Sequence, residues 1–301
     1  MKSIYVILNP VAGRGFSAKS EPAIRECLQN SSLPFEIFHT HHIGHGITLA
    51  EHAVNHGYDI VVAAGGDGTT NEVINGIMNA AEQGKSAVFG VFPTGTGSDF
   101  AFNVGMPADP LEACQRIIDG SVKKIDLGRI SSPGKPPRYF DNQLGIGFDG
   151  IVTVEAKKFK RLRGMALYLP VVLKTVFLTH GPIPVSISCD DETIELEAVQ
   201  ITIANGAREG GGFYMTPDAK VDDGLFDVLI VSKVSKLGML KLIPHFTKGT
   251  HLQLESTSLR RAKKVVVRSK QKLIAHFDGE LLTDDNEITC ELLPKCLDII
   301  C

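Results

Sequence analysis

The chain has 301 residues and a net charge of −3, with 43% apolar and 22% charged residues. This length suits two domains rather than one small core, and the composition is that of an ordinary globular protein. The slightly negative charge argues against a general nucleic-acid binder, because no global basic field would attract phosphates. The six cysteines include no C-x-x-C pair, which disfavours a zinc site or a disulfide framework and is typical of reduced intracellular thiols.

The first 126 residues alternate short apolar runs with helical patterns. The predicted strands are 4–8, 35–38, 60–64 and 88–92, and the predicted helices are 20–29, 47–55, 71–82 and 110–119. Ser20 is expected to cap the first of these helices. Strands that alternate with helices in this way predict a parallel, doubly wound α/β domain over residues 1–126.

From residue 127 onward the pattern changes to closely spaced strands separated by turns such as Asp223-Gly224. The predicted strands are 123–130, 138–140, 184–189, 193–196, 199–204, 225–231, 263–267, 273–277 and 288–293. Two helical stretches, about 155–178 and 235–248, interrupt them. Residues 127–301 are therefore expected to form a mainly antiparallel β domain. The pattern leaves open whether the C-terminal tail returns to the first domain.

Two features of the chain bear on membranes. The N-terminus lacks a secretory apolar region and a cleavage site, so we expect a cytoplasmic protein. Residues 157–180 begin with basic side chains and then become apolar, but Pro170 and Lys174 break the run well short of the ~20 apolar residues of a membrane span. This stretch is either a helix that touches an anionic bilayer or covers a lipid pocket, or a core helix with a solvated first turn.

Three glycine-rich turns follow the predicted strands 4–8, 60–64 and 88–92. Parallel strands end at one edge of a sheet, and α/β folds bind their ligands there. A glycine turn that leads into a helix exposes backbone N–H groups, which suit a phosphate. The second turn also carries Asp67, and a carboxylate beside phosphates suggests an accompanying metal ion or a reacting hydroxyl. Neither a Walker A loop nor a dinucleotide fingerprint fits, because no lysine follows and Asn71 stands where the third glycine would be. For each glycine-rich turn taken alone, the alternative is a plain tight turn without a ligand.

Together these motifs resemble the catalytic region of diacylglycerol kinases, and more narrowly the soluble bacterial branch of the diacylglycerol and sphingosine kinase superfamily. The resemblance begins with Asn9-Pro10-Val11-Ala12-Gly13, Gly65-Gly66-Asp67-Gly68-Thr69, Asn71-Glu72 and the segment from Pro93 to Ala101. It continues in order through residues 145–149, 205–206, 210–212 and 217–225, and it ends at Asp278-Gly279-Glu280. Ser98 and Thr70 depart from the usual Asn and Leu or Ile, which leaves the branch of the superfamily open.

The resemblance implies a two-domain enzyme of phospholipid biosynthesis that phosphorylates diacylglycerol or a related lipid, with ATP in a cleft between an α/β domain and a β-sandwich. The residues that it implies for the nucleotide are Asn9, Pro10, Val11, Ala12, Gly13, Thr40, Gly66, Asp67, Gly68, Thr69, Thr70, Asn71, Glu72 and Thr96. It implies Glu280 as the general base, with Asp278 and Asp67 as further catalytic residues. It also implies a structural Mg²⁺ held by the carbonyls of Lys220 and Leu225 and by Asp223. A hairpin turn is the alternative for both Asp-Gly pairs, 223–224 and 278–279.

General chemistry makes these roles reasonable. Phosphoryl transfer needs positioning, charge neutralisation and a group that takes the hydroxyl proton. Asp67 could engage a Mg²⁺ that accompanies the phosphates, and Glu280 could be aimed as a base from the end of a strand. Such a kinase must visit the membrane surface, where its lipid substrate is. The candidate membrane contacts are Arg14, Lys160, Arg161 and Arg163.

Two other functions compete with a lipid kinase. A NAD kinase also uses the G-G-D-G-T motif, although the Asn9-Pro10 turn and residues 95–101 favour the lipid branch. A regulatory nucleotide-binding module without transfer activity would not need Asp67, Asp278 and Glu280, since binding alone requires no base. The sequence names neither the lipid nor the oligomeric state, and a homodimer stays open.

Overall fold

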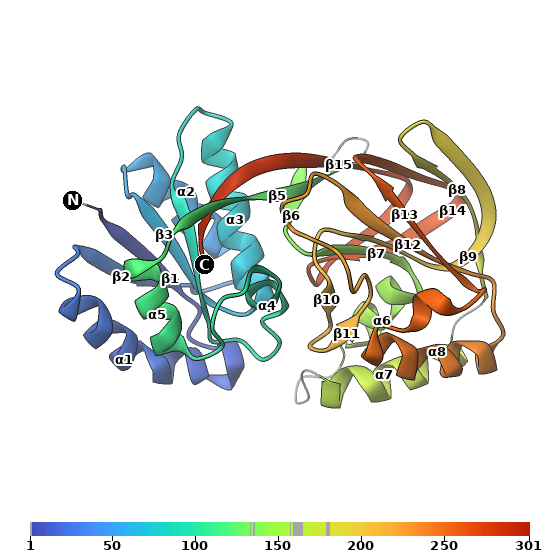
Figure 1. The fold of residues 1–301 in the computed structure, drawn as a ribbon, viewed down its shortest axis with the longest axis horizontal. Coiled ribbons are helices and arrows are strands. Elements are labelled where there is room, and N and C mark those ends of the chain that lie inside the picture. The colour runs from blue at the N-terminus through green and yellow to red at the C-terminus, as the bar shows by residue number, and fades with distance from the viewer. Residues whose placement is uncertain (1, 133, 135, 157, 159–164, 179–180) are drawn as a thin grey trace. The chain divides into compact units, whose positions relative to one another are not determined.

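The computed structural model describes residues 2–132, 134, 136–156, 158, 165–178 and 181–301. The chain forms two compact units (Figure 1). Unit 1 comprises Met1–Ile125 and Lys295–Cys301, and unit 2 comprises Asp126–Pro294. Unit 1 alternates strands and helices and unit 2 is rich in β-strands, so the predicted fold class is confirmed.

Unit 1 contains a parallel sheet with the strand order β4-β3-β1-β2. Its strands are β1 (Ile4–Leu8), β2 (Phe35–His39), β3 (Ile60–Gly65) and β4 (Val88–Pro93). All residues of β1 and β3 are buried. This continuous burial explains why both segments read as unbroken apolar runs, because helices cover a parallel sheet on both faces.

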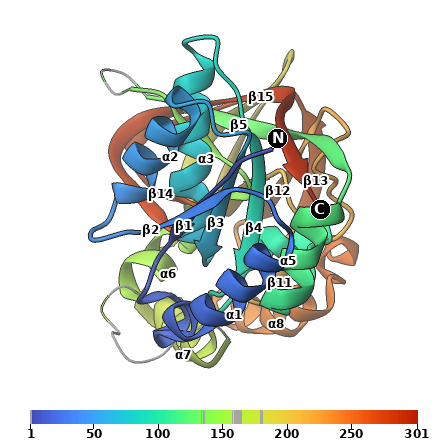
Figure 2. The same cartoon turned by 90° about the vertical axis from the view of Figure 1, so that its left-hand side faces the viewer.

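Two helices lie on each face of this sheet (Figure 2). One pair is α1 (Phe16–Asn30) and α5 (Pro110–Asp119), and the other is α2 (His45–Asn55) and α3 (Asp67–Ala81). The helices α2 and α3 approach closely at Gly76, where a Cβ atom would lie 2.3 Å from the carbonyl oxygen of Ile47. Any side chain at position 76 would therefore push the two helices apart.

The starts of two helices in unit 1 differ from the prediction. Ser20 does not cap α1, because the left-handed Gly15 begins the helix a turn earlier and the Ser20 hydroxyl donates to the Phe16 carbonyl at 2.9 Å. Helix α3 begins at Asp67 instead of residue 71, so the glycine motif forms its first turn. The short helices η1 (Ala12–Arg14) and α4 (Asp99–Val104) follow the other two glycine turns.

Unit 2 is built around two long strands, β9 (Glu192–Ala204) and β14 (Lys264–Phe277). Each pairs along one part with β8 (Ile183–Cys189) and along another with β7 (Gln143–Gly147), so the sheet folds back around a shared core. The remaining strands are β5 (Val122–Ser131), β6 (Arg138–Phe140), β10 (Arg208–Glu209), β11 (Phe213–Tyr214), β12 (Phe226–Ser232), β13 (Thr257–Ala262) and β15 (Glu280–Ile300). The prediction split β9 and β14 into two strands each, because polar residues interrupt their apolar patterns while the backbone pairing continues.

Strand β15 extends from unit 2 into unit 1. Its first part pairs antiparallel with β14, and Ile299 near its end pairs in parallel with Phe89 of β4. Residues Leu297, Ile299 and Ile300 are buried. The C-terminal residues thus complete the sheet of unit 1.

Three longer helices pack against the sheet of unit 2 around a second apolar cluster. They are α6 (Phe148–Ala156), α7 (Met165–Leu178) and α8 (Lys236–Lys248), and the 3₁₀ turn η2 (His251–Gln253) follows α8. The predicted helix 155–178 is replaced by α6 and α7, and the predicted membrane contacts Lys160, Arg161 and Arg163 lie outside the described residues. None of the described helices is both long and apolar enough to cross a membrane. All six cysteines are free thiols.

Candidate active site

The three glycine turns of unit 1 meet at the carboxyl edge of its sheet. A Cβ atom on Gly13 would lie 2.3 Å from the carbonyl oxygen of Thr94, and one on Gly95 would lie 2.2 Å from the Cα atom of Gly66. The loops after β1, β3 and β4 are therefore in backbone contact, which larger residues would prevent. This convergence is what the parallel order of the strands predicts.

Asn9 links the first loop to helix α3. Its side-chain amide donates to the Thr69 hydroxyl at 3.0 Å, and its side-chain carbonyl accepts the Val11 N–H at 3.2 Å. The Asn9 N–H donates to the Ala64 carbonyl at the end of β3 at 2.9 Å. Asparagine suits this position because its amide is both donor and acceptor.

Several features of these loops fit a phosphate group. Helix α3 starts after Gly66 and has no side-chain cap, so the positive end of its dipole faces the loops without a capping group. The hydroxyls of Thr94 and Ser98 are buried, and the structure gives neither a hydrogen-bond partner. Buried hydroxyls normally have partners, so this pair is consistent with a ligand that binds beside them.

Two acidic residues of α3 bind backbone in neighbouring loops. The carboxylate of Asp67 accepts the Phe100 N–H at 3.0 Å at the start of α4. The two oxygens of Glu72 accept the N–H groups of Gly44 and Gly46, both at 2.8 Å, just before and within the first turn of α2. Both carboxylates therefore hold loops in place. Their predicted contacts with a metal ion and a nucleotide stay predictions.

The other predicted nucleotide residues of unit 1 lie in two settings. Thr40 is buried, and its N–H donates to the Leu8 carbonyl at 2.9 Å, which brings the loop after β2 to the same edge. Thr96 is exposed in the third loop. Thr70 and Asn71 are buried within α3, and Asn71 accepts hydrogen bonds from Asn75. Their burial gives Thr70 and Asn71 a packing role, whatever else they contact.

The predicted base lies beside a tight hairpin in unit 2. Asp278 and Gly279 join β14 to β15 with φ angles of 45° and 84°, as a two-residue hairpin turn requires. The carboxylate of Asp278 accepts the N–H groups of Asp141 at 2.9 Å and Gln143 at 3.0 Å. Asp278 thus anchors this turn to the segment between β6 and β7.

Glu280 is the first residue of β15, and its carboxylate pairs with Arg138 at 2.8 Å. Both side chains are 34% exposed. The guanidinium of Arg138 also lies over the ring of Phe277, 5.5 Å from its centre. Arg138 therefore fixes the Glu280 carboxylate at an accessible position, a role that sequence analysis missed.

The motif Asn205-Gly206 holds the segment to which this turn is anchored. The buried Asn205 amide donates to the carbonyls of Asp126 at 2.9 Å and Asp141 at 3.0 Å. The Gln143 amide donates to the Gly206 carbonyl at 3.1 Å. These bonds connect segments that are far apart in the sequence and hold the backbone to which Asp278 is anchored.

The predicted structural metal site contains a charged neighbour. Asp223 pairs with Arg261 and accepts the Leu225 N–H at 3.2 Å. Arg261 also lies 3.4 Å from the buried Asp227, and burial raises the pKa of Asp227 while the guanidinium opposes that rise. The other oxygen of Asp227 is buried and has no hydrogen-bond partner. The predicted metal ligands Lys220, Asp223 and Leu225 stay predictions, and a cation there would share Asp223 with Arg261. The sequence did not reveal Asp227 or Arg261.

Unit 2 contains a partly open apolar cavity with a volume of about 70 Å³. Its walls come mainly from α6, α7, α8 and β9, with side chains such as Val176, Met239 and Phe246. Asp149 and Glu209 also line it and place acidic groups against its apolar wall. The apolar lining suits part of the tail of an amphiphilic ligand.

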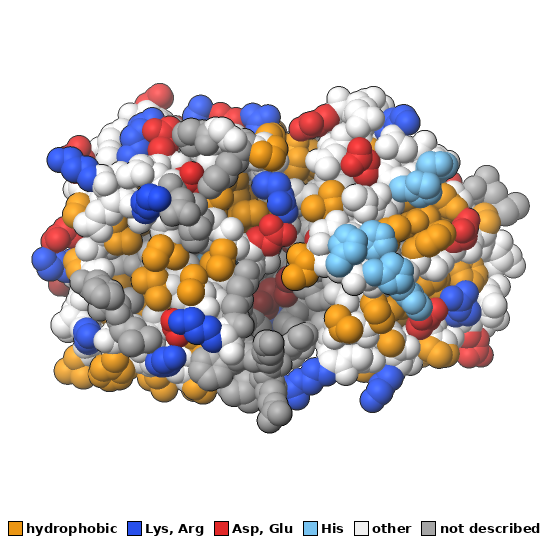
Figure 3. All heavy atoms as spheres, turned by 180° about the vertical axis from the view of Figure 1, so that it is seen from behind, with side chains coloured by type: hydrophobic (Ala, Val, Ile, Leu, Met, Phe, Trp, Pro, Cys, Tyr) orange, Lys and Arg blue, Asp and Glu red, His pale blue; other side chains and the backbone are white. Residues whose placement is uncertain are grey.

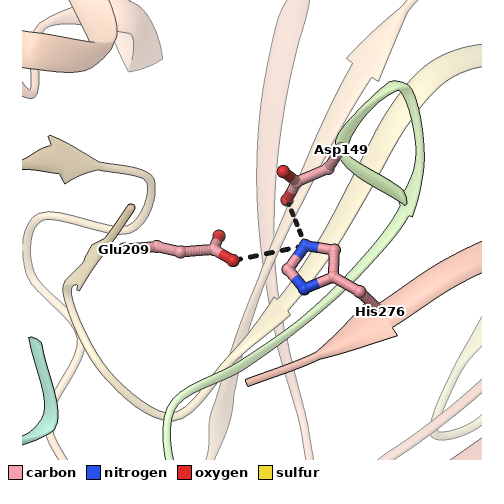
Figure 4. Close-up of side chains that lie close together, drawn as sticks. All are labelled: Asp149, Glu209 and His276. Atoms are coloured by element: carbon pink, nitrogen blue, oxygen red, sulfur yellow. Dashed lines mark ion pairs between the residues drawn. The ribbon is translucent and has the colours of Figure 1, made fainter. Parts of the chain in front are cut away.

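A buried histidine pairs with both of these acidic groups. The Nε2 atom of His276 lies 3.1 Å from Asp149 and 3.2 Å from Glu209 (Figure 4). Burial opposes the charged imidazolium, but the two carboxylates outweigh this effect and raise the pKa of His276 to about 9. Sequence analysis quoted Asp149 within a motif and missed the other two. No sequence pattern relates His276 to these two carboxylates.

A doubly wound unit with converging glycine loops, followed by a β-rich unit with an acidic residue at a hairpin, defines a nucleotide-dependent phosphotransferase. Residues 3–130 match the diacylglycerol kinase catalytic domain, and residues 142–301 match the YegS C-terminal NAD kinase beta sandwich-like domain. The chain belongs to the diacylglycerol kinase family. It is therefore a lipid kinase, an ATP-dependent phosphotransferase with an alcohol group as acceptor, as the sequence predicted.

Individual relatives agree over nearly the whole chain. A diacylglycerol kinase from Staphylococcus epidermidis is 30% identical over 280 residues, which cover 93% of this chain and 86% of the relative. One from Bacillus subtilis is 29% identical over 284 residues and covers 93% and 90%. A solved structure of a Bacillus anthracis protein assigned as a diacylglycerol kinase superposes with a TM-score of 0.80 at 25% identity and covers 99% and 96%.

Proposed function

We propose that the protein transfers the γ-phosphate of ATP to the free hydroxyl of a diacylglycerol at a membrane surface. The observation that carries this proposal is the apolar cavity in unit 2. A water-soluble acceptor such as NAD has no apolar tail that would fill such a cavity. The names of the curated relatives, which are diacylglycerol kinases, support the same acceptor.

In this proposal the glycine loops of unit 1 bind the nucleotide phosphates. The backbone of the loops after β1, β3 and β4 and the hydroxyls of Thr94 and Ser98 supply the donors. The Asp67 carboxylate lies at the start of α3, where it would hold a Mg²⁺ that arrives with ATP. Such an ion neutralises the charge that phosphoryl transfer develops on the phosphate oxygens.

Glu280 serves as the general base. As the acceptor oxygen bonds to the γ-phosphorus and the bond to the ADP oxygen breaks, the hydroxyl proton passes to the Glu280 carboxylate. Arg138 orients this carboxylate through the 2.8 Å ion pair, and Asp278 fixes the start of β15 through its two backbone hydrogen bonds. Asp278 is accordingly a positioning residue.

The loop at Lys220, Asp223 and Leu225 would hold a second cation with a structural role. The buried oxygen of Asp227 that lacks a partner supports a nearby positive ion. The Gly224 N–H donates to the buried Asp126 carboxylate at 2.7 Å. A cation that fixes this loop would therefore also fix Asp126 at the start of unit 2.

The acyl chains of the acceptor would lie in the cavity of unit 2. Each methylene that leaves water contributes about 0.8 kcal/mol, so even part of one chain would supply substantial binding energy. The polar groups at the cavity wall would leave the glycerol end as the part that stays solvated. This orientation keeps the hydroxyl accessible to phosphoryl transfer.

Helices α7 and α8 would contact the bilayer that contains the substrate. Leu169, Leu173 and Phe177 recur every four residues on α7 and form one exposed apolar stripe. Leu237 of α8 is 65% exposed, and the neighbouring Lys236 donates to the Phe177 carbonyl at 2.9 Å. Figure 3 shows hydrophobic side chains along this edge of the unit. Since Val172 and Val176 of α7 line the cavity, one helix would face both the bilayer and the bound lipid.

A lipid-panel assay tests the proposed function. The protein is incubated with ATP, Mg²⁺, dissolved NAD and mixed vesicles that contain diacylglycerol and other hydroxyl lipids. The products are identified by mass spectrometry. We expect phosphatidic acid as the main product. We expect Glu280→Gln to lower kcat by about 10²–10⁴-fold while ATP binding persists. Phosphorylation of NAD alone, or full activity in Glu280→Gln, would overturn the respective assignment.

A further inference from the structure

Three potential metal ligands converge beside the apolar cavity of unit 2 (Figure 4). Asp149 comes from α6, Glu209 from β10 and His276 from β14. One donor atom from each lies within 4.8 Å of the other two. His276 is 2% exposed, while the two carboxylates reach the cavity wall. The three elements are distant in the sequence, so the tertiary fold itself builds this cluster.

The spacing of the donor atoms fits shared coordination of one ion. Ligands that bind one ion at roughly 2.0–2.2 Å and at angles near 90–110° lie roughly 3.0–3.5 Å apart. The His276 Nε2 atom is 3.1 Å from the Asp149 oxygen and 3.2 Å from the Glu209 oxygen. Both His276 Nε2 and this Asp149 oxygen are buried, and neither is aligned for a hydrogen bond.

A glycine leaves room beside the donor atoms. A Cβ atom on Gly145 of β7 would lie 2.3 Å from the Asp149 oxygen and 2.7 Å from His276 Nε2. The backbone of Gly145 does not have a positive φ angle, so space rather than conformation calls for glycine here. An alanine at this position would displace the proposed ligands.

Charge and donor type indicate which ion the cluster would bind. Two carboxylates and a neutral imidazole carry a charge of −2, which a divalent cation would neutralise. Mg²⁺ and Ca²⁺ prefer oxygen ligands, whereas a set of one imidazole and two carboxylates suits first-row transition metals. We propose that Asp149, Glu209 and His276 form a binding site for a divalent transition-metal ion, separate from the nucleotide metal and from the loop at Asp223.

The accessible side of this site is the cavity. Since Asp149 and Glu209 both line the cavity, the coordination positions that the protein leaves open would face it. A ligand in the cavity could then reach the ion through an oxygen atom. The existence of the site does not depend on which lipid is phosphorylated, and its test measures metal binding rather than activity.

The first test measures Mn²⁺ binding to the full chain after chelator treatment. Free Mn²⁺ is followed by electron paramagnetic resonance in an excess of Mg²⁺, which fills the all-oxygen sites. Mn²⁺ is suitable because it is lowest in the divalent series and therefore binds weakly to exposed histidines such as His41 and His42. We expect one bound Mn²⁺ per chain in the wild-type protein and its loss in Glu209→Gln, His276→Gln and Gly145→Ala.

The matched control is Glu192→Gln. Glu192 is an exposed carboxylate of β9 in the same unit, and it pairs with Arg260 instead of the cluster. This variant should retain the bound Mn²⁺. Retention by the cluster variants, or no binding by the wild-type protein under these conditions, would overturn the proposal.

A second test does not rely on the folding of any variant. Crystals of the wild-type protein are soaked in Mn²⁺, and anomalous scattering locates the ion. A peak between the three side chains supports the site. If Mn²⁺ is found elsewhere while this position holds none, His276 pairs with the carboxylates as an imidazolium and the proposal fails.

Discussion

Gln143 and Asp278 are joined by two reciprocal hydrogen bonds. The Gln143 N–H donates to the Asp278 carboxylate at 3.0 Å, and the Asp278 N–H donates to the Gln143 carbonyl at 3.1 Å. This pair connects the start of β7 to the hairpin that precedes Glu280. The position of the proposed base, Glu280, therefore depends on Asp278, whose carboxylate holds the backbone in place.

Replacing Asp278 tests this dependence. Asp278→Ala leaves two backbone N–H groups without their acceptor, so we expect a loss of about 1–3 kcal/mol in the free energy of unfolding, together with lower kcat. Asp278→Asn keeps an acceptor oxygen and should retain more of both. Urea unfolding and steady-state kinetics provide the measurements. Equal stability of Asp278→Ala and the wild-type protein would show that the anchor is dispensable.

Arg138 offers a test of how the base is held. Arg138→Met removes the ion pair to Glu280 but keeps an apolar group over Phe277. We expect kcat to fall by roughly tenfold because the carboxylate is no longer oriented, while the affinity for ATP stays unchanged. Arg129→Met, which breaks a comparable pair with Glu291 elsewhere in the chain, is the matched control. Similar kinetics in the two variants would contradict a role for Arg138.

Gly13 and Gly15 form a matched pair for the nucleotide loops. Both have positive φ angles, but a Cβ atom meets the Thr94 carbonyl only at Gly13, and nothing lies within 4 Å at Gly15. Gly15→Ala should cost only the ~1–2 kcal/mol of left-handed backbone strain. Gly13→Ala should in addition separate the two loops and weaken ATP binding by more than tenfold. Calorimetric titration with ATP measures the difference, and equal affinities would disprove the contact's importance.

Glu155 links α6 to α7 and gives a dependence on pH. Hydrogen bonds from Lys158 and Lys174 lower the pKa of Glu155 against the opposing effect of burial. The folded pKa is thus below the unfolded value, so the stabilisation is present above about pH 4.5 and disappears as the pH falls through the folded pKa. The unfolding free energies of the wild-type protein and Glu155→Gln should differ at pH 7 and converge in acid. Parallel curves throughout would argue against this linkage.

The apolar stripe on α7 makes membrane contact testable. Leu173→Glu and Phe177→Glu place charges where side chains would enter a bilayer, so vesicle binding should drop by at least about tenfold. Leu111→Glu is the control, since Leu111 is 47% exposed on α5 of unit 1. Activity on a short-chain, water-soluble diacylglycerol should remain close to that of the wild-type protein in all three. Unchanged sedimentation with vesicles would remove α7 from the proposal.

The convergence of the three glycine loops could be predicted from the sequence because their geometry is local. Each glycine turn follows its own buried strand, and parallel pairing brings the strand ends together without further information. The lengths of β9 and β14 and the start of α1 were predicted less well, since hydrogen bonds rather than apolar patterns decide them. At the start of α1, the left-handed Gly15 overrides the capping tendency of Ser20.

The cluster of His276, Asp149 and Glu209 in unit 2 escaped prediction for a different reason. His276, Asp149 and Glu209 meet only because β14 pairs with β7 and because β10 lies nearby in the fold. Antiparallel pairing between distant strands leaves no periodic signal that relates one residue to another. The same holds for Arg261 of β13, which pairs across from Asp227 of β12 and so reaches Asp223 in the turn before that strand.

The path of β15 has a consequence for biosynthesis. Ile299 supplies a parallel neighbour to Phe89, so the sheet of unit 1 lacks a strand until the last residues of the chain have been made. Domains usually fold as they leave the ribosome, N-terminal first. Here the N-terminal unit must wait with an open sheet edge while unit 2 is synthesised. A nascent chain that stalls before residue 295 would therefore leave the sheet edge of unit 1 exposed to aggregation and proteolysis.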